Sequence, residues 1–275
     1  MTFVEKFIGT ASGAQSPIGV FDSGVGGTSV LKEMYTLMPC ENYWYYGDGA
    51  NAPYGTKAVE FVRERTLYCL SRMVKNGAKA LVIACNTATA AAVTLSRETF
   101  DVPVISMEPE IKTPAVVRHK RALVMATPMT LQLERFKKLM RRFEGETDMV
   151  LLPCPGLSDL VEVGKIDAPE TREYLSALLD DAIASPVDSI VLGCTHYPHI
   201  KPLIREILGY DVAIYDGGAG TARELRRRLA QMDMLNTSGM PGQILFENSM
   251  DGTAMTSLSR ELFERYVPTV NIAHG

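Results

Sequence analysis

The sequence predicts an α/β protein built from two mostly parallel units that face each other across a cleft. Short apolar strands alternate with helical segments along the chain, and this alternation favours parallel sheets. Two of the strands, at residues 80–84 and 189–193, end at a cysteine and lead into a helical segment. The two thiols, Cys85 and Cys194, are far apart in the chain, so we expect one in each unit.

The two thiols occupy similar places in the predicted structure. A thiol between a strand and a helix lies near unpaired backbone N–H groups and the positive end of the helix dipole, and both favour the thiolate. Asn86 and Thr87 can cap the helix that follows Cys85, and Thr195 follows Cys194. Because one such cysteine would be weak evidence, the second copy makes the pattern informative.

The first unit begins with a strand at residues 18–21 that ends in a glycine-rich loop. In open α/β sheets ligands bind at such strand ends, so Asp22 and Ser23 are candidate site residues. The glycines do not match a dinucleotide fingerprint, because Ser29 stands where the third glycine should be, and nucleotide binding is the weaker interpretation. The alternative is that Asp22 only caps the next helix, which is predicted at residues 29–37.

A long loop at residues 47–55 follows the aromatic strand at residues 43–46. Loops of this kind carry functional sites on rigid scaffolds. The backbone N–H groups around Tyr54 and Gly55 could hold an anion, although a plain turn explains this segment equally well. The rest of the first unit is predicted as a helix at 57–77, the Cys85 strand with its helix, and a strand at 102–107.

The second unit repeats this order of elements, although the repeat is topological rather than literal. It begins with a strand at residues 122–125, whose loop opens a helix running to residue 140. Besides the Cys194 strand, we expect strands at 150–155 and 212–215 and helices at 157–163 (with Glu162), 171–184 and 199–208. A helix from 216 to 232, a strand at 243–247 and a helix at 253–266 complete the chain.

Composition and charge argue against several classes of function. A net charge of −4 with 22% charged residues gives no basic surplus of the kind typical of nucleic-acid binding, and we interpret the arginines at 226–228 as a solvated helix face. No apolar run is long enough to cross a bilayer, and residues 1–15 lack the features of a secretion signal. We therefore expect a soluble protein that binds neither nucleic acid nor membrane.

The cysteines and histidines form no known metal or disulfide pattern. The five cysteines include no C-x-x-C pair, and the four histidines have no zinc spacing with them. We expect free thiols in a reducing cytoplasm. Cys194 and His196 could be two ligands of a metal site, but a partner pair at short spacing is absent, so we predict no metal. Cys154 is interpreted as a strand-end residue and His199 as a surface or capping residue.

Two acid/base groups on opposite walls of a cleft suit racemisation, in which one group removes a proton from a carbon and the other returns one to the opposite face. The reference pKa of cysteine, about 8.5, can be lowered towards neutrality. We expect Asp22 to tune Cys85 and His196 to tune Cys194. The carbanion also needs polar groups to hold its charge. The candidates that follow strand ends are Ser23, Asn86, Thr87 and Thr195.

No lysine stands at a strand end in a setting that suggests a pyridoxal Schiff base, and no glycine loop suggests a redox cofactor. We therefore predict chemistry without a cofactor. An activity that depended on added pyridoxal phosphate would contradict this.

Four motifs in order resemble the signatures of the bacterial glutamate racemase family. They are DSGVGG at 22–27, PYG at 53–55, ACNTAT at 84–89 and GCTHYP at 193–198. The likeness runs from residue 18 to about residue 229, and weakly through the tail. It implies a cytoplasmic, cofactor-independent enzyme that interconverts L- and D-glutamate, the D-isomer being used to build peptidoglycan.

The resemblance also implies two α/β domains related by a pseudo-twofold axis, with the active site in the cleft between them. The expected division is residues 1–109 with 216–275 on the Cys85 side and residues 110–215 on the Cys194 side. We expect the protein to be a homodimer.

The same likeness suggests a role for each site residue. Cys85 and Cys194 would be the catalytic acid/bases, with Asp22 assisting the first and His196 the second. The residues at the α-centre would be Ser23, Asn86, Thr87 and Thr195. The residues holding the side-chain carboxylate would be Pro53, Tyr54, Gly55 and Thr130, and Glu162 would help to place the ammonium. Ala126 and the two glycines after Asp216 depart from the family pattern without touching the thiol motifs.

Three alternatives stay open on the sequence. An aspartate or hydantoin racemase of the same superfamily would also use opposed thiols. The PYG motif favours glutamate, and the decay of circular dichroism with L-glutamate and L-aspartate separates the two. A two-lobed ligand-binding protein would have no use for two strand-end thiols and should carry a secretion signal. A thiol redox or metal protein would be indicated if Cys85→Ser and Cys194→Ser each left racemisation intact.

Overall fold

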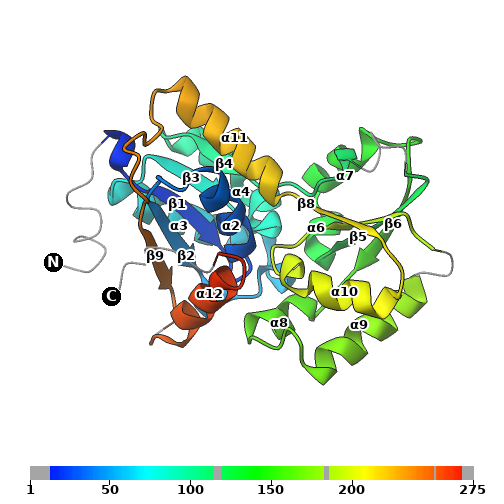
Figure 1. Cartoon of the computed structure of the whole chain (residues 1–275). Coiled ribbons are helices and arrows are strands. Elements are labelled where there is room, and N and C mark those ends of the chain that lie inside the picture. The colour runs from blue at the N-terminus through cyan, green and yellow to red at the C-terminus, as the bar shows by residue number, and fades with distance from the viewer. Residues whose placement is uncertain (1–12, 114–118, 183–185, 251, 268–275) are drawn as a thin grey trace.

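The computed structural model describes residues 13–113, 119–182, 186–250 and 252–267, and it contains the two predicted units as two lobes (Figure 1). Each lobe is built on one sheet. The strand order is β4-β3-β1-β2-β9 in the first sheet and β6-β5-β7-β8 in the second. Every strand pair in these described ranges is parallel. The predicted fold class is therefore confirmed.

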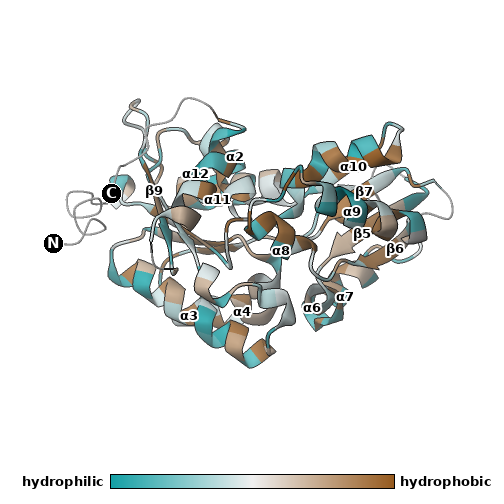
Figure 2. Cartoon of the chain, turned by 90° about the horizontal axis from the view of Figure 1, so that it is seen from below, coloured by the Kyte–Doolittle hydropathy of each residue, from teal (hydrophilic) through white to brown (hydrophobic). Residues whose placement is uncertain are grey.

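The first sheet is covered by helices on both faces, which explains why its strands read as continuous apolar runs. Alternate residues of β1 face opposite sides: Val20 packs towards α2, α11 and α12, and Phe21 packs towards α3 and α4. Figure 2 shows the two groups of helices on opposite sides of the sheet. The strands are β1 (Ile18–Asp22), β2 (Tyr43–Gly47), β3 (Ala80–Ile83), β4 (Val104–Ser106) and β9 (Ile244–Asn248). The helices are α2 (Thr28–Leu37), α3 (Val59–Lys75), α4 (Asn86–Thr99), α11 (Gly218–Gln231) and α12 (Ala254–Glu264).

The second sheet is also sandwiched between helices. Leu123 and Ile190 pack towards α8, α9 and α10, whereas Val124 and Val191 pack with Phe136 of α7 on the other face. The strands are β5 (Arg121–Ala126), β6 (Asp148–Pro153), β7 (Ser189–Leu192) and β8 (Ala213–Asp216). The helices are α6 (Pro128–Gln132), α7 (Glu134–Arg141), α8 (Leu157–Glu162), α9 (Pro169–Ala182) and α10 (Lys201–Leu208).

The chain passes from the first lobe to the second after β4 and returns after β8. Helix α11 then packs against α2, and β9 pairs with β2 at the edge of the first sheet. The carboxyl ends of β1, β3, β5 and β7 lead into loops that meet between the lobes. Of residues 1–15, the structure describes those from Gly13 on, where a short 3₁₀ turn, η1 (Gly13–Gln15), begins.

The structure differs from the predicted elements in three places. The helix expected to run to residue 140 is divided into α6 and α7, because Leu133 between them has extended backbone angles (φ −71°, ψ 139°). The helix expected at 199–208 begins as a 3₁₀ turn, η4 (Tyr197–Ile200), and becomes α-helical only in α10. The loop after β2 contains two further 3₁₀ turns, η2 (Gly49–Asn51) and η3 (Tyr54–Thr56).

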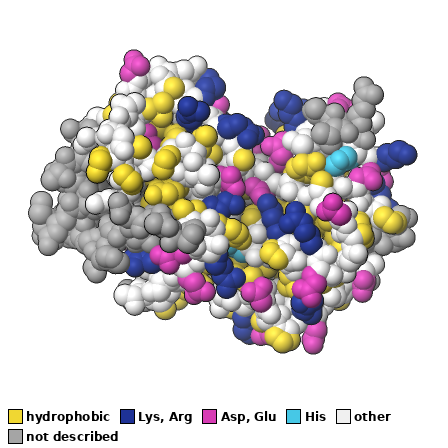
Figure 3. All heavy atoms as spheres, viewed as in Figure 1, with side chains coloured by type: hydrophobic (Ala, Val, Ile, Leu, Met, Phe, Trp, Pro, Cys, Tyr) yellow, Lys and Arg dark blue, Asp and Glu magenta, His cyan; other side chains and the backbone are white. Residues whose placement is uncertain are grey.

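The surface carries charges of both signs. Figure 3 shows Lys and Arg interspersed with Asp and Glu over the face seen there, including the region where the lobes meet. Within the described ranges, no helix combines the length and apolar character that would let it cross a membrane.

Candidate active site

Cys85 and Cys194 come from different lobes and line the same small cavity. Cys85 follows β3 and is the N-cap residue of α4, where the Ala88 N–H donates to its Sγ at 3.5 Å. Cys194 follows β7, and its Sγ lies 3.5 Å from Nδ1 of His196. Both thiols are largely buried, with 5% and 7% of their surfaces exposed. The structure thus brings the two strand-end thiols to one place between the lobes.

The predicted site residues gather around this cavity. All of them except Asp22 and Thr130 line it. Its volume is about 20 Å³, room for little more than one water molecule. An amino acid does not fit in that space, so substrate entry requires the lobes or their loops to separate.

Three buried polar atoms at the cavity lack a hydrogen-bond partner within the described part of the chain. They are the side-chain oxygen and nitrogen of Asn86 and Oε1 of Glu162. Buried polar groups are nearly always paired, so unpaired groups in a cavity wall indicate a ligand with both donors and acceptors. An α-amino acid has both.

The Cys85 thiol is held mainly in its neutral form. Burial raises its pKa to about 12, and the negative charge of Asp22 adds to that effect. The Ser23 hydroxyl and the Ala88 N–H lower the pKa, as the helix start is expected to do, but their effect is smaller than that of burial. The expectation that Asp22 tunes the pKa of Cys85 towards neutrality is therefore wrong.

Asp22 lies behind the cavity wall and is fully buried. Its Oδ1 accepts the Gly24 N–H at 3.0 Å, and its Oδ2 accepts the Thr195 hydroxyl at 3.1 Å. The second bond joins the lobes, because Thr195 directly follows Cys194. Burial raises the pKa of Asp22 to about 6, although the nearby His196 lowers it. Asp22 therefore acts electrostatically on Cys85 while its hydrogen bond goes to the residue after the other thiol.

His196 stands between a thiol and a carboxylate. Its Nδ1 faces Cys194 Sγ, and its Nε2 lies 2.7 Å from Oε2 of Glu162. Burial would lower the pKa of His196, but the hydrogen bonds and charges of Cys194 and Glu162 raise it well above its ordinary value. Because Glu162 Oε2 also accepts the Val25 N–H at 2.9 Å, this carboxylate links the histidine to the glycine loop of the first lobe.

Three threonine hydroxyls form a cluster across the cleft. Oγ1 of Thr87 lies 3.2 Å from that of Thr127 and 3.1 Å from that of Thr130, and the last two are 2.9 Å apart. Thr127 lines the cavity, whereas Thr130 lies behind it. Thr130 is a predicted site residue, whereas Thr127 is an additional one. Thr127 could have been found, because it follows β5 as Ser23 follows β1.

Ser158 is the other polar cavity residue that the sequence analysis misses. It lies on α8 four positions before Glu162, on the same side of the helix. Once Glu162 is placed in the site, the helical period predicts that Ser158 faces the same side.

The interpretation of His199 as a surface or capping residue is wrong. It is 3% exposed, and its Nε2 lies 3.2 Å from Oγ1 of Thr28. Burial lowers its pKa to about 3, so it is neutral. The reason is the turn η4, which directs His199 towards the first lobe instead of continuing β7 into an exposed helix start. Cys154 is buried as well, and burial raises its pKa to about 12.

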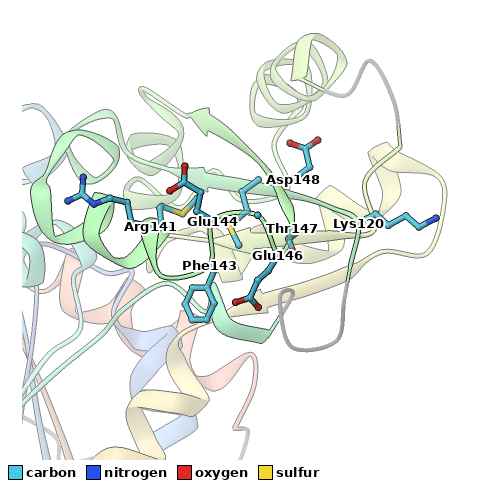
Figure 4. Close-up of a pocket in the computed structure, with 10 residues that line it drawn as sticks. Lys120, Arg141, Phe143, Glu144, Glu146, Thr147 and Asp148 are labelled. Atoms are coloured by element: carbon cyan, nitrogen blue, oxygen red, sulfur yellow. The ribbon is translucent and has the colours of Figure 1, made fainter.

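A larger cavity lies elsewhere, beside the turn between α7 and β6 in the second lobe. Its volume is about 710 Å³. Figure 4 shows that the charged side chains around it, such as Lys120, Glu146 and Asp148, point in different directions rather than towards a common centre. Over the described residues, no three His, Cys, Asp or Glu side chains are grouped so as to hold a metal ion. The cleft with the two thiols is therefore the candidate active site.

Curated proteins with similar sequences are glutamate racemases. The chain is 44% identical to glutamate racemase from Clostridium botulinum (strain Alaska E43 / Type E3) over 90% of this chain and 97% of that protein. It is 45% identical to glutamate racemase from Clostridium acetobutylicum over 90% of this chain and 98% of that protein.

Solved structures agree with the sequence relatives. Glutamate racemase from Thermus thermophilus, in complex with β-chloro-D-alanine, matches with a TM-score of 0.75 and 33% identity, covering 96% of this chain and 98% of that one. Escherichia coli glutamate racemase, in complex with L-glutamate and the activator UDP-MurNAc-Ala, matches with a TM-score of 0.79 and 27% identity, covering 93% and 96%. The model of the Asp/Glu/hydantoin racemase family matches residues 28–225. The chain therefore belongs to the Asp/Glu/hydantoin racemase family.

Proposed function

We propose that this chain is a glutamate racemase that interconverts L- and D-glutamate by proton transfer between Cys85 and Cys194. The observation that carries the proposal is the placement of two thiols from opposite lobes in the wall of one cavity. A thiolate on one side of the α-carbon removes its proton, and the thiol on the other side gives one back. The next turnover in the opposite direction uses the same two groups with their roles exchanged.

Each thiol has its own acid/base environment in this mechanism. The raised pKa of His196 favours its protonated form, which places a positively charged N–H at Nδ1, 3.5 Å from the Cys194 sulfur. Cys85 needs help to ionise, because its pKa is raised to about 12. The ammonium group of a bound amino acid supplies a positive charge inside the closed site, and a positive charge near a thiol favours the thiolate.

Different polar residues of the cavity wall are proposed to bind different groups of glutamate. Ser23, Asn86, Thr87 and Thr195 are proposed to hold the groups on the α-carbon. The unpaired amide of Asn86 can accept from the ammonium and donate to the carboxylate. Oε1 of Glu162, which is also unpaired, is available to the ammonium, while Oε2 stays on His196.

The side-chain carboxylate is proposed to bind at the other end of the cavity. Pro53, Tyr54 and Gly55 line that part of the wall, and Thr127 faces Gly55 from the second lobe. Thr130 contributes indirectly, through its hydrogen bonds to Thr87 and Thr127. A carboxylate accepts hydrogen bonds from hydroxyls and backbone N–H groups, both of which this end of the cavity offers.

The proposal includes the cell biology and assembly that the family resemblance implies. We propose that the product D-glutamate is used to build peptidoglycan, that the enzyme works in the cytoplasm as a homodimer, and that no cofactor takes part. We also propose the division into domains 1–109 with 216–275 and 110–215. Light scattering of the purified protein tests the dimer.

The decay of circular dichroism tests the activity. Purified protein without added cofactor should bring L-glutamate and D-glutamate to the same racemic end point. L-Aspartate should react much more slowly. Faster turnover of aspartate would assign the chain to a different substrate within the family, and an unchanged signal with both would contradict the proposal.

A further inference from the structure

The loop that lines one end of the cavity is fixed to the first lobe through the side chain of Tyr54. The Tyr54 ring is 1% exposed and belongs to the core formed by β1, β2, α3 and α4, where its centroid lies 6.3 Å from that of Phe21. Its hydroxyl donates to Oδ2 of Asp48 at 2.6 Å. Since Pro53, Tyr54 and Gly55 all line the cavity, the position of this wall depends on where the Tyr54 side chain is held.

Asp48 is a buried charge with a hydrogen bond to this tyrosine. Its side chain is fully buried. Burial would raise its pKa, but hydrogen bonds from Arg65, Tyr54 and Asn51 bring the pKa below its usual value. A buried carboxylate keeps its charge only where it is paired and fully hydrogen-bonded. The position of Tyr54 therefore depends on the group that balances Asp48.

Arg65 of α3 is that group. Its Nε donates to Oδ2 of Asp48 at 3.0 Å and its Nη2 to Oδ1 at 2.6 Å, which is the two-pronged geometry that makes arginine–carboxylate pairs strong. The guanidinium also lies over the ring of Tyr68, 4.9 Å from its centroid. Arg65 itself does not line the cavity. Its hydrogen bonds connect it to the cavity wall through Asp48 and Tyr54.

The opposite side of the loop leaves little freedom for movement. A Cβ atom added to Gly55 would lie 3.0 Å from Cβ of Thr127, so the loop backbone is already in close contact with the second lobe. A small displacement of Tyr54 would therefore change the contact between Gly55 and Thr127 at the carboxylate end of the cavity.

We infer that Arg65 is a positioning residue for the substrate's side-chain carboxylate, an inference that rests on the proposed function. The relay runs from Arg65 through Asp48 and Tyr54 to the backbone at residues 53–55. Loss of Arg65 leaves Asp48 as an uncompensated buried charge, and the carboxylate must take up a proton or move. Either change loosens the loop and weakens glutamate binding, whereas the thiols on their own strand ends keep their geometry.

The test compares two arginines of the same helix. Arg65→Gln removes the relay. Arg72→Gln is the matched control, because Arg72 also pairs with a carboxylate, Glu247, at 3.0 Å, and also lies over aromatic rings. Glu247 accepts from Trp44 of the core, and within the described ranges it makes no hydrogen bond to the cavity loop. Because the Asp48 side chain is fully buried and that of Glu247 is 25% exposed, Arg65→Gln should lose more thermal stability than Arg72→Gln. The assays are therefore run at a temperature where both variants are folded, so that a difference between them in KM reports the relay.

Steady-state racemisation of L-glutamate should separate KM from kcat. Arg65→Gln should raise KM about tenfold, the effect of roughly 1.4 kcal/mol, with kcat changed less than about threefold. Arg72→Gln should leave KM within about twofold of wild type. Arg65→Lys should raise KM less than Arg65→Gln does but should not reach the wild-type value, because lysine supplies the positive charge without the paired N–H donors of arginine. Tyr54→Phe should raise KM, and combining it with Arg65→Gln should add little, since both act on one relay.

Equal changes of KM in Arg65→Gln and Arg72→Gln would overturn the inference, as would a fall in kcat at constant KM. If Arg65→Gln does not fold, the inference is tested with Arg65→Lys and Tyr54→Phe. Wild-type KM values in both of these variants would overturn the inference. Failure of the proposed function has a different signature. A wild-type protein that leaves glutamate optically unchanged contradicts the function and the inference together, whereas an active wild type with unaltered Arg65 variants contradicts the inference alone.

Discussion

Oε2 of Glu162 lies 2.7 Å from Nε2 of His196, and the other ring nitrogen of that histidine faces the Cys194 thiol. The carboxylate thus keeps a proton on the imidazole from one side while the sulfur approaches from the other. The glycine loop of the first lobe joins the same carboxylate through the Val25 N–H. The histidine beside the second thiol is therefore coupled to a contact between the lobes.

Glu162→Gln should shift the pH dependence of racemisation. The negative charge of Glu162 helps to raise the pKa of His196, and without it burial brings that pKa down. The alkaline limb of the kcat/KM profile should then move to lower pH, with a loss of about tenfold at pH 8 and a smaller loss at pH 6. Glu173→Gln, at an exposed glutamate of α9, is the control. Superimposable profiles for Glu162→Gln and wild type would contradict this coupling.

Asp22→Asn should stabilise the protein above pH 6 while removing activity. Burial raises the folded-state pKa of Asp22 from 3.8 to about 6, so its ionisation costs stability as pH rises through that range. The cost is absent below pH 3.8 and complete above pH 6, where it reaches about 3 kcal/mol. Urea unfolding should therefore show little difference between variant and wild type at pH 4 and a more stable variant at pH 8. A variant less stable than wild type at pH 8 would contradict this reading of Asp22.

Thr127→Val should weaken binding of glutamate. The substitution removes a hydroxyl that lines the cavity and bonds to two other threonines. Loss of one such hydrogen bond is worth roughly 1 kcal/mol, so KM should rise about fivefold. Thr127→Ser keeps the hydroxyl and should behave like wild type. Thr99→Val, at an exposed threonine that bonds only within α4, controls for the loss of a hydroxyl as such. An unchanged KM in Thr127→Val would exclude Thr127 from the carboxylate end of the cavity.

The strands were predictable because they are short, apolar and bounded by loop residues. The strands β1, β2 and β3 are buried on both faces, so each has a continuous apolar sequence. Such a sequence is typical of a parallel sheet that is covered by helices on both sides. The break between α6 and α7 was not predictable from the local sequence. It falls at Leu133, where no proline or glycine marks the end of a helix.

The composition of the site was predictable to the extent that it follows strand ends. Ser23 comes directly after β1, Cys85 lies just beyond the end of β3, and Cys194 and Thr195 lie just beyond the end of β7. Parallel strands bring those ends to one edge of a sheet. Contacts across the lobes were not predictable, because they depend on how two sheets dock. The bond between Thr195 and Asp22 is of this kind, and so is the burial of His199 against Thr28.

The incorporation of solvent deuterium at the α-carbon of glutamate tests the two-thiol mechanism most directly. Wild-type protein in D₂O should give racemic glutamate carrying deuterium at that position. Cys85→Ser and Cys194→Ser should each lower the rate of racemisation by about a thousandfold or more, and Cys40→Ser, at a half-buried thiol away from the cavity, should not. A wild-type rate of racemisation in a folded Cys85→Ser or Cys194→Ser protein would contradict the account.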